Sequence, residues 1–168
     1  MNLIRNTIRK ILFEQMSEEE ELAEFKKWHK PKEAEVAVDE ITDMFKLKDW
    51  WETGSWGNER KMYEVEYEPE PNCIVRMRVQ ASYGGIYLDE IETTPDCEGK
   101  GYATEAINMI KTVAKKHMVK IRLEAKAFHT HKGEGRMSTA SLRSWYVSLG
   151  FKPRGWFPGD KPLQWLPK

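Results

Sequence analysis

The stretch from Ile86 to Lys116 combines a strand, a glycine-bearing loop and a helix, an order that suits anion binding. Apolar residues alternate towards Thr93, the loop contains Gly99 and Gly101, and apolar residues from Ala103 onward recur every three or four positions. The first N–H groups of a helix have no partner within the helix, and its dipole is positive there. Glycine also lets the backbone approach a ligand closely. The sequence therefore predicts a phosphate or pyrophosphate site at this loop.

The spacing of the loop separates it from two common phosphate-binding motifs. It lacks the GxxxxGK[ST] pattern of a P-loop, and Thr104 stands where a dinucleotide-binding fold has its third glycine. The loop resembles instead the acetyl-CoA loop of the GNAT superfamily of N-acetyltransferases, written Arg/Gln-x-x-Gly-x-Gly/Ala. Gly101 and Ala103 match its last two fixed positions, whereas Glu98 stands where the family has Arg or Gln.

A second motif resembles the same family further along the chain. Residues 141 to 151, SLRSWYVSLGF, are similar to the late GNAT helix, whose Tyr-x-x-x-Gly-Phe ending corresponds here to Tyr146, Gly150 and Phe151. The order and separation of the two motifs also agree with the family. The resemblance covers roughly Met62 to the C-terminus.

The resemblance implies an α/β (α+β) fold with a GNAT-like mixed sheet, mostly antiparallel, flanked by helices. Alternation predicts strands over 61–68, 73–81 and 86–93, which form an antiparallel meander because their connections are short. A strand over 120–128 follows the central helix and should therefore run parallel to its predecessor. In the GNAT fold these two parallel strands splay apart, and the pantetheine arm of the cofactor lies between them.

The same resemblance assigns roles to residues near the loop. Backbone amides of 98–104 would hold the pyrophosphate of acetyl-CoA, and backbone groups of 91–93 would align pantetheine and polarise the thioester. The candidate cofactor-binding residues are Ile91, Glu92, Thr93, Glu98, Gly99, Lys100, Gly101, Tyr102, Ala103, Thr104 and Thr139. We expect no metal.

Three side chains are candidates for catalysis. Tyr146 matches the family's general acid to the leaving sulfur, although periodicity alone fits a core aromatic equally well. Glu90 and Glu92 alternate with apolar residues on the central strand and are candidate bases for an amine acceptor, with an exposed carboxylate pair as the alternative. Glu98 would repel a pyrophosphate unless it turns outward or Lys100 offsets it, which predicts weak cofactor binding.

Composition excludes several classes of function. The 168 residues include 27 basic and 27 acidic side chains, which argues against broad binding of nucleic acid. No apolar run approaches the roughly 20 residues of a membrane span. Cys73 and Cys97 lie far apart without a CxxC motif, so we expect reduced cysteines in a cytoplasmic protein, with neither a disulfide nor a zinc site. His129 and His131 lack a third ligand nearby and are expected in a solvated loop, with a substrate-facing role as the alternative.

The N-terminal part is expected to be helical. Residues 1–15 form a basic amphipathic stripe that could pack on the domain, on a second copy or on a partner protein, with contact to a membrane surface as a further alternative. The short N-terminus resembles those of tailed-bacteriophage proteins, and this resemblance would place the chain in the host cytoplasm. A second helix should start at Ser17 and end at Pro31. We therefore divide the chain into a 1–30 helical extension and a 31–168 GNAT-like domain.

The start of that domain departs from the family pattern. Lys32 to Leu47 has a helical pattern, and Asp49 to Asn58 reads as a loop with three tryptophans that cap the core edge or line a pocket. No opening strand is evident before residue 61. The tail, with its prolines, should add one or two edge strands.

Three functional hypotheses follow. The first is an acetyl-CoA-dependent transferase acting on a primary amine of a small molecule or protein, by direct attack in a ternary complex. The second is a catalytically weak or inactive GNAT-like domain that serves as an interaction or assembly module. The third is a GNAT-like nucleobase-modifying enzyme.

Overall fold

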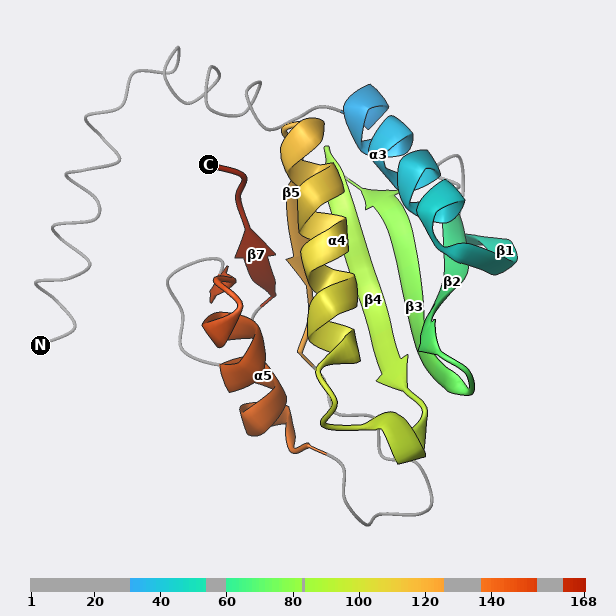
Figure 1. The fold of residues 1–168 in the computed structure, drawn as a ribbon. Coiled ribbons are helices and arrows are strands. Elements are labelled where there is room, and N and C mark those ends of the chain that lie inside the picture. Colours follow the sequence, from blue (N-terminus) through green and yellow to red (C-terminus); the bar gives the residue numbers. More distant parts are fainter. Residues whose placement is uncertain (1–30, 54–59, 83, 126–136, 154–161) are drawn as a thin grey trace, which may run out of the picture.

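The computed structural model describes residues 31–53, 60–82, 84–125, 137–153 and 162–168. Within them, a seven-stranded sheet has the strand order β1-β2-β3-β4-β5-β7-β6 (Figure 1). The strands are β1 (Lys46–Thr53), β2 (Arg60–Glu70), β3 (Cys73–Ser82), β4 (Gly85–Thr93), β5 (Lys120–Leu123), β6 (Lys152–Pro153) and β7 (Leu163–Trp165). The helices are α3 (Pro31–Met44), α4 (Tyr102–Lys116) and α5 (Thr139–Ser148), with a 3₁₀ turn η1 (Pro95–Cys97).

The expected fold class is confirmed. Strands β1 to β4 form an antiparallel meander, β5 pairs with β4 in parallel, and β7 and β6 complete the sheet in antiparallel pairing. The parallel pair is possible because α4 carries the chain back along the sheet between β4 and β5. The molecule is thus a mixed, mostly antiparallel sheet with helices beside it.

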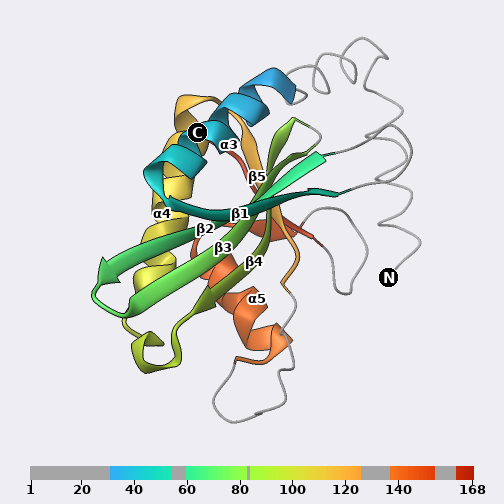
Figure 2. The ribbon, with the colours of Figure 1, turned by 90° about the vertical axis from the view of Figure 1, so that its right-hand side faces the viewer.

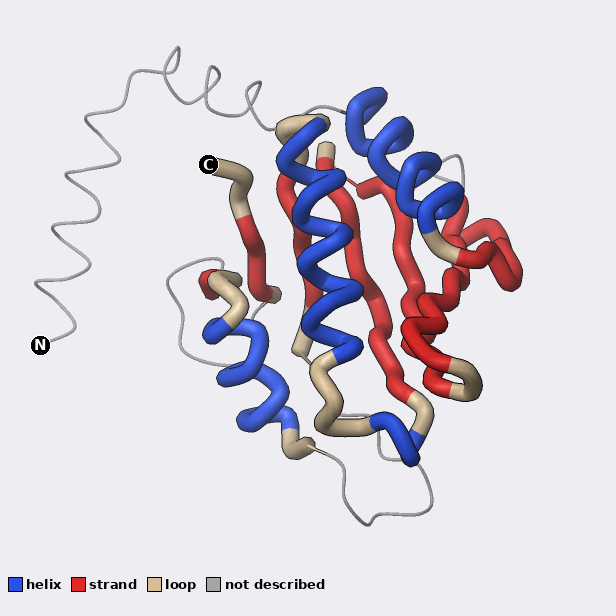
Figure 3. Tube along the Cα trace, in the orientation of Figure 1, coloured by secondary structure: helices blue, strands red, loops and turns tan. Residues whose placement is uncertain are grey.

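Helices α3 and α4 pack on the same face of the sheet, as the two perpendicular views show (Figures 1 and 2). Figure 3 separates these helices from the strands behind them by colour. Alternate side chains of β3 are buried beneath them, and Met77 is completely inaccessible. Ile41 of α3 and Ile110 of α4 are buried in the same core. Each such side chain contributes about 1.5–3 kcal/mol to stability.

The start of the domain differs from the expectation. Pro31 is the first residue of α3, a position that proline favours because its missing N–H has no intrahelical role there. The helix expected from Ser17 up to Pro31 lies outside the described residues. Helix α3 ends at Met44, and β1 covers both the expected end of the helix at Leu47 and the start of the expected loop. The opening strand is therefore present. It lies at the sheet edge and is mostly exposed, so it lacks an apolar alternation.

The C-terminal strands agree with the expectation. Pro153 lies in β6 at the outer edge of the sheet, where a missing N–H costs no ladder hydrogen bond. Strand β5 ends at Leu123, earlier than expected, and residues 126–136 lie outside the described ranges together with His129 and His131. The 1–30 extension also lies outside them, so its helices and the boundary after residue 30 stay predictions. Among the described residues, no helix combines the length and apolarity that crossing a membrane requires.

The expectation of two reduced cysteines is wrong. Cys73 and Cys97 form a disulfide, with Cα atoms 5.6 Å apart and a sequence separation of 24. Cys73 opens β3, and β3 pairs with β4 so that Val75 lies opposite Thr93, four residues before Cys97. Strand pairing therefore brings together two cysteines whose spacing in sequence gave no sign of it.

Candidate functional site

The parallel strands β4 and β5 stay together for only part of their length. Their pairing runs from Gly85–Lys120 to Leu88–Leu123, while β4 continues to Thr93. The strands meet closely at their first pair, where a Cβ on Gly85 would lie 2.5 Å from the Lys120 carbonyl oxygen. The second half of β4 therefore lies beyond the paired segment of β5.

A β-bulge lies where the two strands part. On β3, Val79 pairs with Leu88 and its neighbour Arg78 pairs with Glu90, which leaves Asp89 as an extra residue of β4. A bulge bends its strand and increases the local twist. The bend gives β4 a new direction just where its pairing with β5 ends.

A cavity of about 640 Å³ opens at this point. That volume lies within the roughly 300–1,000 Å³ of small-molecule sites. The cavity is lined by the end of β4, the glycine loop, the first turn of α4, and α5. The lining residues are Asp89, Glu90, Ile91, Glu92, Thr93, Cys97, Glu98, Gly99, Gly101, Tyr102, Ala103, Thr104, Glu124, Met137, Leu142, Trp145 and Tyr146.

The N-terminus of α4 presents backbone N–H groups at the cavity wall. Glu105 N–H donates to the Gly101 carbonyl at 3.0 Å, closing the first turn, so the amides of 102–104 precede every intrahelical bond. Gly101 is the N-cap and supplies no side-chain acceptor for them. It has φ +88° and Gly99 has φ +79°, values that glycine adopts without strain. This end of the helix is suited to an anion.

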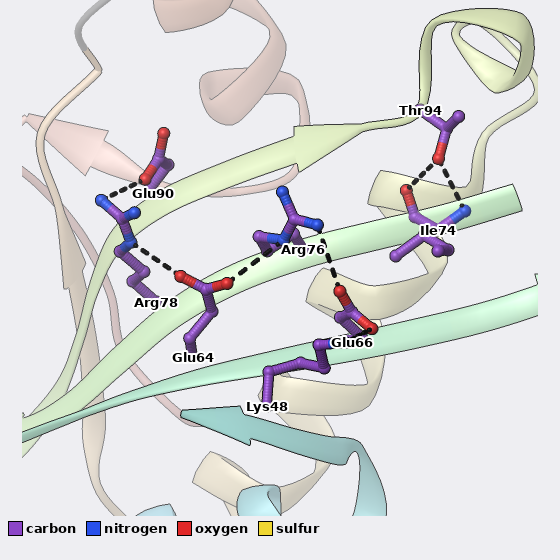
Figure 4. A network of polar contacts seen from close by, with 8 residues as sticks. All are labelled: Lys48, Glu64, Glu66, Ile74, Arg76, Arg78, Glu90 and Thr94. Atoms are coloured by element: carbon purple, nitrogen blue, oxygen red, sulfur yellow. Dashed lines mark hydrogen bonds and ion pairs between the residues drawn. The ribbon is translucent and has the colours of Figure 1, made fainter. Parts of the chain in front are cut away.

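Thr94 fixes the end of β4 to β3. Its N–H donates to the Ile74 carbonyl at 2.9 Å. Its Oγ1 accepts from the Ile74 N–H at 2.9 Å and donates to the Ile74 carbonyl at 3.1 Å (Figure 4). The 3₁₀ turn η1 follows directly, and Cys97 at its end is buried at the cavity wall. The glycine loop therefore starts from a fixed point on the sheet.

Helix α5 brings Tyr146 to the cavity. The Tyr146 ring is 4% exposed and stands edge-on to Phe151, with centroids 5.7 Å apart. Burial raises the pKa of the Tyr146 hydroxyl well above its ordinary value. The neighbouring Trp145 Nε1 donates to Thr104 Oγ1 at 3.3 Å, and the Lys111 ammonium donates to the Leu149 carbonyl. These two bonds hold α5 against α4.

Both ends of α5 have residues that suit them. Ser138 is the N-cap, and its hydroxyl accepts from the Ser141 N–H at 3.1 Å. Gly150, just after the helix, has φ +86°, a conformation common where helices end. Local residue types alone therefore define this helix.

Glu90 is held in place by a row of alternating charges that crosses four strands (Figure 4). Arg78 Nη1 lies 2.7 Å from Glu90 Oε2, and Arg78 Nε lies 3.3 Å from Glu64 Oε2. We call the set Lys48, Glu66, Arg76, Glu64, Arg78 and Glu90 the charge row. The six charges sum to zero, so the negative charge of the Glu90 carboxylate at the cavity is balanced by Arg78 within the row.

Sequence reasoning missed the charge row, although a signal was present. Glu64 pairs across the strands with Arg78, and Glu66 pairs with Arg76. Opposite charges directly across two antiparallel strands stabilise the pair. The two alternating segments are joined by a short turn, so their acidic and basic faces could have been matched.

The structure brings most of the predicted site residues together. Those that line the cavity are Glu90, Ile91, Glu92, Thr93, Glu98, Gly99, Gly101, Tyr102, Ala103, Thr104 and Tyr146. Lys100 and Thr139 do not line it, and the Lys100 ammonium lies 3.6 Å from the Glu70 carboxylate instead of offsetting Glu98. Trp50 and Trp51 do not line it either. The catalytic and cofactor-binding roles assigned to all these residues stay predictions.

The tryptophans of β1 contact cations. The Lys61 ammonium lies 5.2 Å from the centre of the Trp50 ring, and the Arg78 guanidinium lies 5.4 Å from that of Trp51. Trp50 is half exposed at the sheet edge. The described part of this aromatic stretch thus belongs to the sheet and its charged face, and Trp56 lies outside the described residues.

The chain was also compared with known proteins. No protein-family model and no curated protein matches it. Among solved structures it is similar to the anti-CRISPR protein AcrVA5, with a TM-score of 0.46 and 19% identity over 61% of this chain and 97% of that one. It is also similar to the KacTA–DNA complex, with a TM-score of 0.39 and 10% identity over 66% and 70% of the two chains. At these values the likenesses assign the chain neither a family nor an activity.

Proposed function

We propose that this protein transfers an acetyl group from acetyl-CoA to a primary amine. The observation that carries the proposal is the cavity where β4 and β5 part, because it combines three functional groups. These are the second half of β4, which extends beyond the segment that pairs with β5, the uncapped amides of α4, and the buried hydroxyl of Tyr146. In acyl transfer from a thioester, these three features would align the thioester, bind the pyrophosphate and protonate the leaving thiolate, respectively.

The cofactor would lie between the two parting strands. The amides of 102–104 would bind the pyrophosphate, and the backbone of 91–93 would align pantetheine along β4. An amide of β4 next to the thioester would donate a hydrogen bond to its oxygen as charge develops there. The protein's own part is therefore to hold the thioester in line with the acceptor.

The transfer itself needs two proton movements. The amine nitrogen attacks the thioester carbon and loses a proton to a carboxylate at the acceptor side, for which Glu92 and Glu90 are the candidates. The tetrahedral intermediate then collapses, the C–S bond breaks, and the leaving thiolate takes the proton of the Tyr146 hydroxyl. Arg78 Nη1, 2.7 Å from Glu90 Oε2, orients the Glu90 carboxylate, and both glutamates remain candidates for the proton uptake.

The test is titration of the full chain with acetyl-CoA by calorimetry, followed by mass spectrometry of a panel of amines incubated with protein and cofactor. Gly101→Leu should abolish binding, because its side chain would occupy the open space at the cavity wall. Gly150→Leu is the matched control: it has nearly the same φ but does not line the cavity. Equal loss of binding in both variants, or a product heavier by something other than an acetyl group, would contradict the proposal.

One observation favours a second candidate, a GNAT-like domain that acts as an interaction module. Glu98 lines the cavity next to the amides, where its carboxylate opposes an anion. If millimolar acetyl-CoA produces no heat of binding and no rise in the unfolding temperature, this second function replaces the first. The partner would then be sought through residues 1–15.

A further inference from the structure

The Cys73–Cys97 disulfide is built into the wall of the cavity. The side chain of Cys97 lines the cavity and is 4% exposed, whereas its neighbours from Pro95 to Gly101 are exposed. Cys73 is the first residue of β3 and is equally buried. One end of the cross-link therefore belongs to the sheet, and the other is the single buried side chain of the loop before α4.

The other contacts of this loop are weaker restraints. Lys100 and the Tyr102 hydroxyl both reach the Glu70 carboxylate, but the Lys100 and Glu70 side chains are about half exposed. Exposed ion pairs contribute little and are screened by salt. Gly99 and Gly101 also leave the backbone more conformational freedom than other residues would. Thr94 fixes where the loop begins and α4 fixes where it ends, so the covalent link at Cys97 is the main restraint on the residues between them.

We propose that this disulfide is a redox switch of the cavity, and that its reduction weakens the binding of acetyl-CoA. This inference rests on the proposed function, because it concerns the same site. A dithiol supplies the two electrons and two hydrogens: the S–S bond breaks, each cysteine ends as a thiol, and the dithiol is oxidised to its own disulfide. No group of the protein other than the two sulfurs changes its oxidation state.

The effect on binding follows from the population of the competent loop. When only a fraction of the molecules holds the loop in its binding position, the apparent dissociation constant rises by the inverse of that fraction. The disulfide keeps the fraction near one by fixing Cys97 to β3. We expect the dissociation constant for acetyl-CoA to rise about tenfold on reduction, which corresponds to a competent fraction of about one tenth.

The experiment compares the oxidised full chain with the same protein reduced by a trialkylphosphine, which leaves the thioester of acetyl-CoA intact. Here the phosphine is oxidised to its oxide with oxygen from water, whose two hydrogens end on the sulfurs. Thiol titration checks that both cysteines are free, and calorimetry measures acetyl-CoA binding. The Cys73→Ser/Cys97→Ser double variant is the control, which should bind like the reduced protein and not respond to phosphine.

Hydrogen exchange locates the change. We expect the amides of 97–102 to exchange faster on reduction by a larger factor than the amides of β2 and β3, whose exchange reports the unfolding of the whole domain. Equal affinity of the oxidised and reduced proteins would overturn the switch and leave the proposed function intact. The same factor at 97–102 as in β2 and β3 would also overturn it, because the disulfide would then act on the whole fold and not on the loop. Absence of binding to the oxidised protein would overturn the proposed function instead.

Discussion

The Tyr146 hydroxyl keeps its proton throughout the physiological pH range. Its ring is buried between α5 and the cavity, and burial disfavours the charged phenolate, which raises the pKa. The neutral phenol is the form that holds a proton for the leaving thiolate. The raised pKa also makes the hydroxyl a weaker acid, so the transfer depends on the basicity of the thiolate.

Replacing Tyr146 with Phe tests that role. The variant keeps the ring that packs against Phe151 and removes only the hydroxyl. If the hydroxyl is the general acid, we expect kcat to fall about 10²-fold, with little change in the dissociation constant for acetyl-CoA. Steady-state kinetics and calorimetry measure the two effects. Tyr63→Phe, a half-buried tyrosine away from the cavity, is the control, and an unchanged kcat in Tyr146→Phe would remove the residue from the mechanism.

Glu98 sets the electrostatics of the proposed pyrophosphate site. Glu98→Arg replaces a repulsion by an attraction, so we expect acetyl-CoA to bind about tenfold more tightly at low salt, with the gain shrinking as salt is added. Glu33→Arg makes the same charge change on an exposed position of α3 and is the control. Calorimetric dissociation constants at two salt concentrations measure the effect. If both variants behave alike, Glu98 does not face the bound cofactor.

The cavity residues that sequence analysis identified are those with a local signature. Glycines at fixed spacing before an amphipathic helix mark the N-terminus of α4 without any knowledge of the fold. Cys97 and Trp145 were missed as cavity residues, because each reaches the wall through a contact with a distant segment, β3 in one case and Thr104 in the other. Such contacts depend on tertiary structure.

At the scale of elements, a polar cluster joins the C-terminal end of α4 to α3. Glu40 accepts hydrogen bonds from Lys116 Nζ at 2.8 Å, and its carboxylate lies 2.7 Å from His117 Nε2. The bond from Lys116, and next that from His117, lower the pKa of Glu40 below its ordinary value. The cluster stabilises the packing of α3 on α4 while Glu40 is ionised.

This shift predicts the acid dependence of stability. Because the folded pKa of Glu40 is depressed, its contribution is complete above the unfolded value near 4.5 and is lost as pH falls through the folded one. Glu40→Gln should therefore be less stable than the natural protein at pH 7, and the difference should narrow below about pH 4.5. Urea denaturation at both pH values measures it. Asp43→Asn on the same helix is the control, and a difference independent of pH would argue against the ion pairs.

Elements were predictable where one face of a strand or helix is buried. In β2 to β4 apolar residues alternate with polar ones, and in α4 apolar residues recur every three or four positions. The bounds of these elements were close to the expected ones. Strand β1 was missed because an edge strand with mostly exposed side chains has no such pattern. In α3, Ala34, Ala37, Val38 and Ile41 form the buried face, while Val36 and Met44 are exposed, so the large apolar residues alone define that face only in part.

At the scale of the whole molecule, the disulfide closes a long stretch of chain. The Cys73–Cys97 link spans 24 residues, including all of β4 and the turns on either side of it. In the chain-entropy model such a link stabilises the fold by about 3 kcal/mol, by restricting the unfolded state. That is a sizeable share of the roughly 5–15 kcal/mol that typical domains possess.

We therefore expect the Cys73→Ser/Cys97→Ser variant to remain folded at 25 °C and to lose about 3 kcal/mol of unfolding free energy. Urea denaturation followed by circular dichroism measures this loss, and the phosphine-reduced natural protein should lose a similar amount. A variant as stable as the oxidised protein would mean that the cross-link does not constrain the unfolded chain.

The bulge at Asp89 is one extra residue in β4, and it lies where β4 and β5 separate. On either side of it the side chains alternate: Leu88 is buried in the core, Glu90 lies in the charge row, and Ile91 is partly buried against the core. Removing Asp89 would therefore leave an unbroken alternation and allow β4 to continue straight beside β5. Point substitutions do not change the number of residues in β4, so they leave the extra residue in place. The cavity therefore depends on the number of residues in β4. Deletion of the single codon for Asp89, and not a substitution, is the genetic change that would remove the bulge and close the cavity.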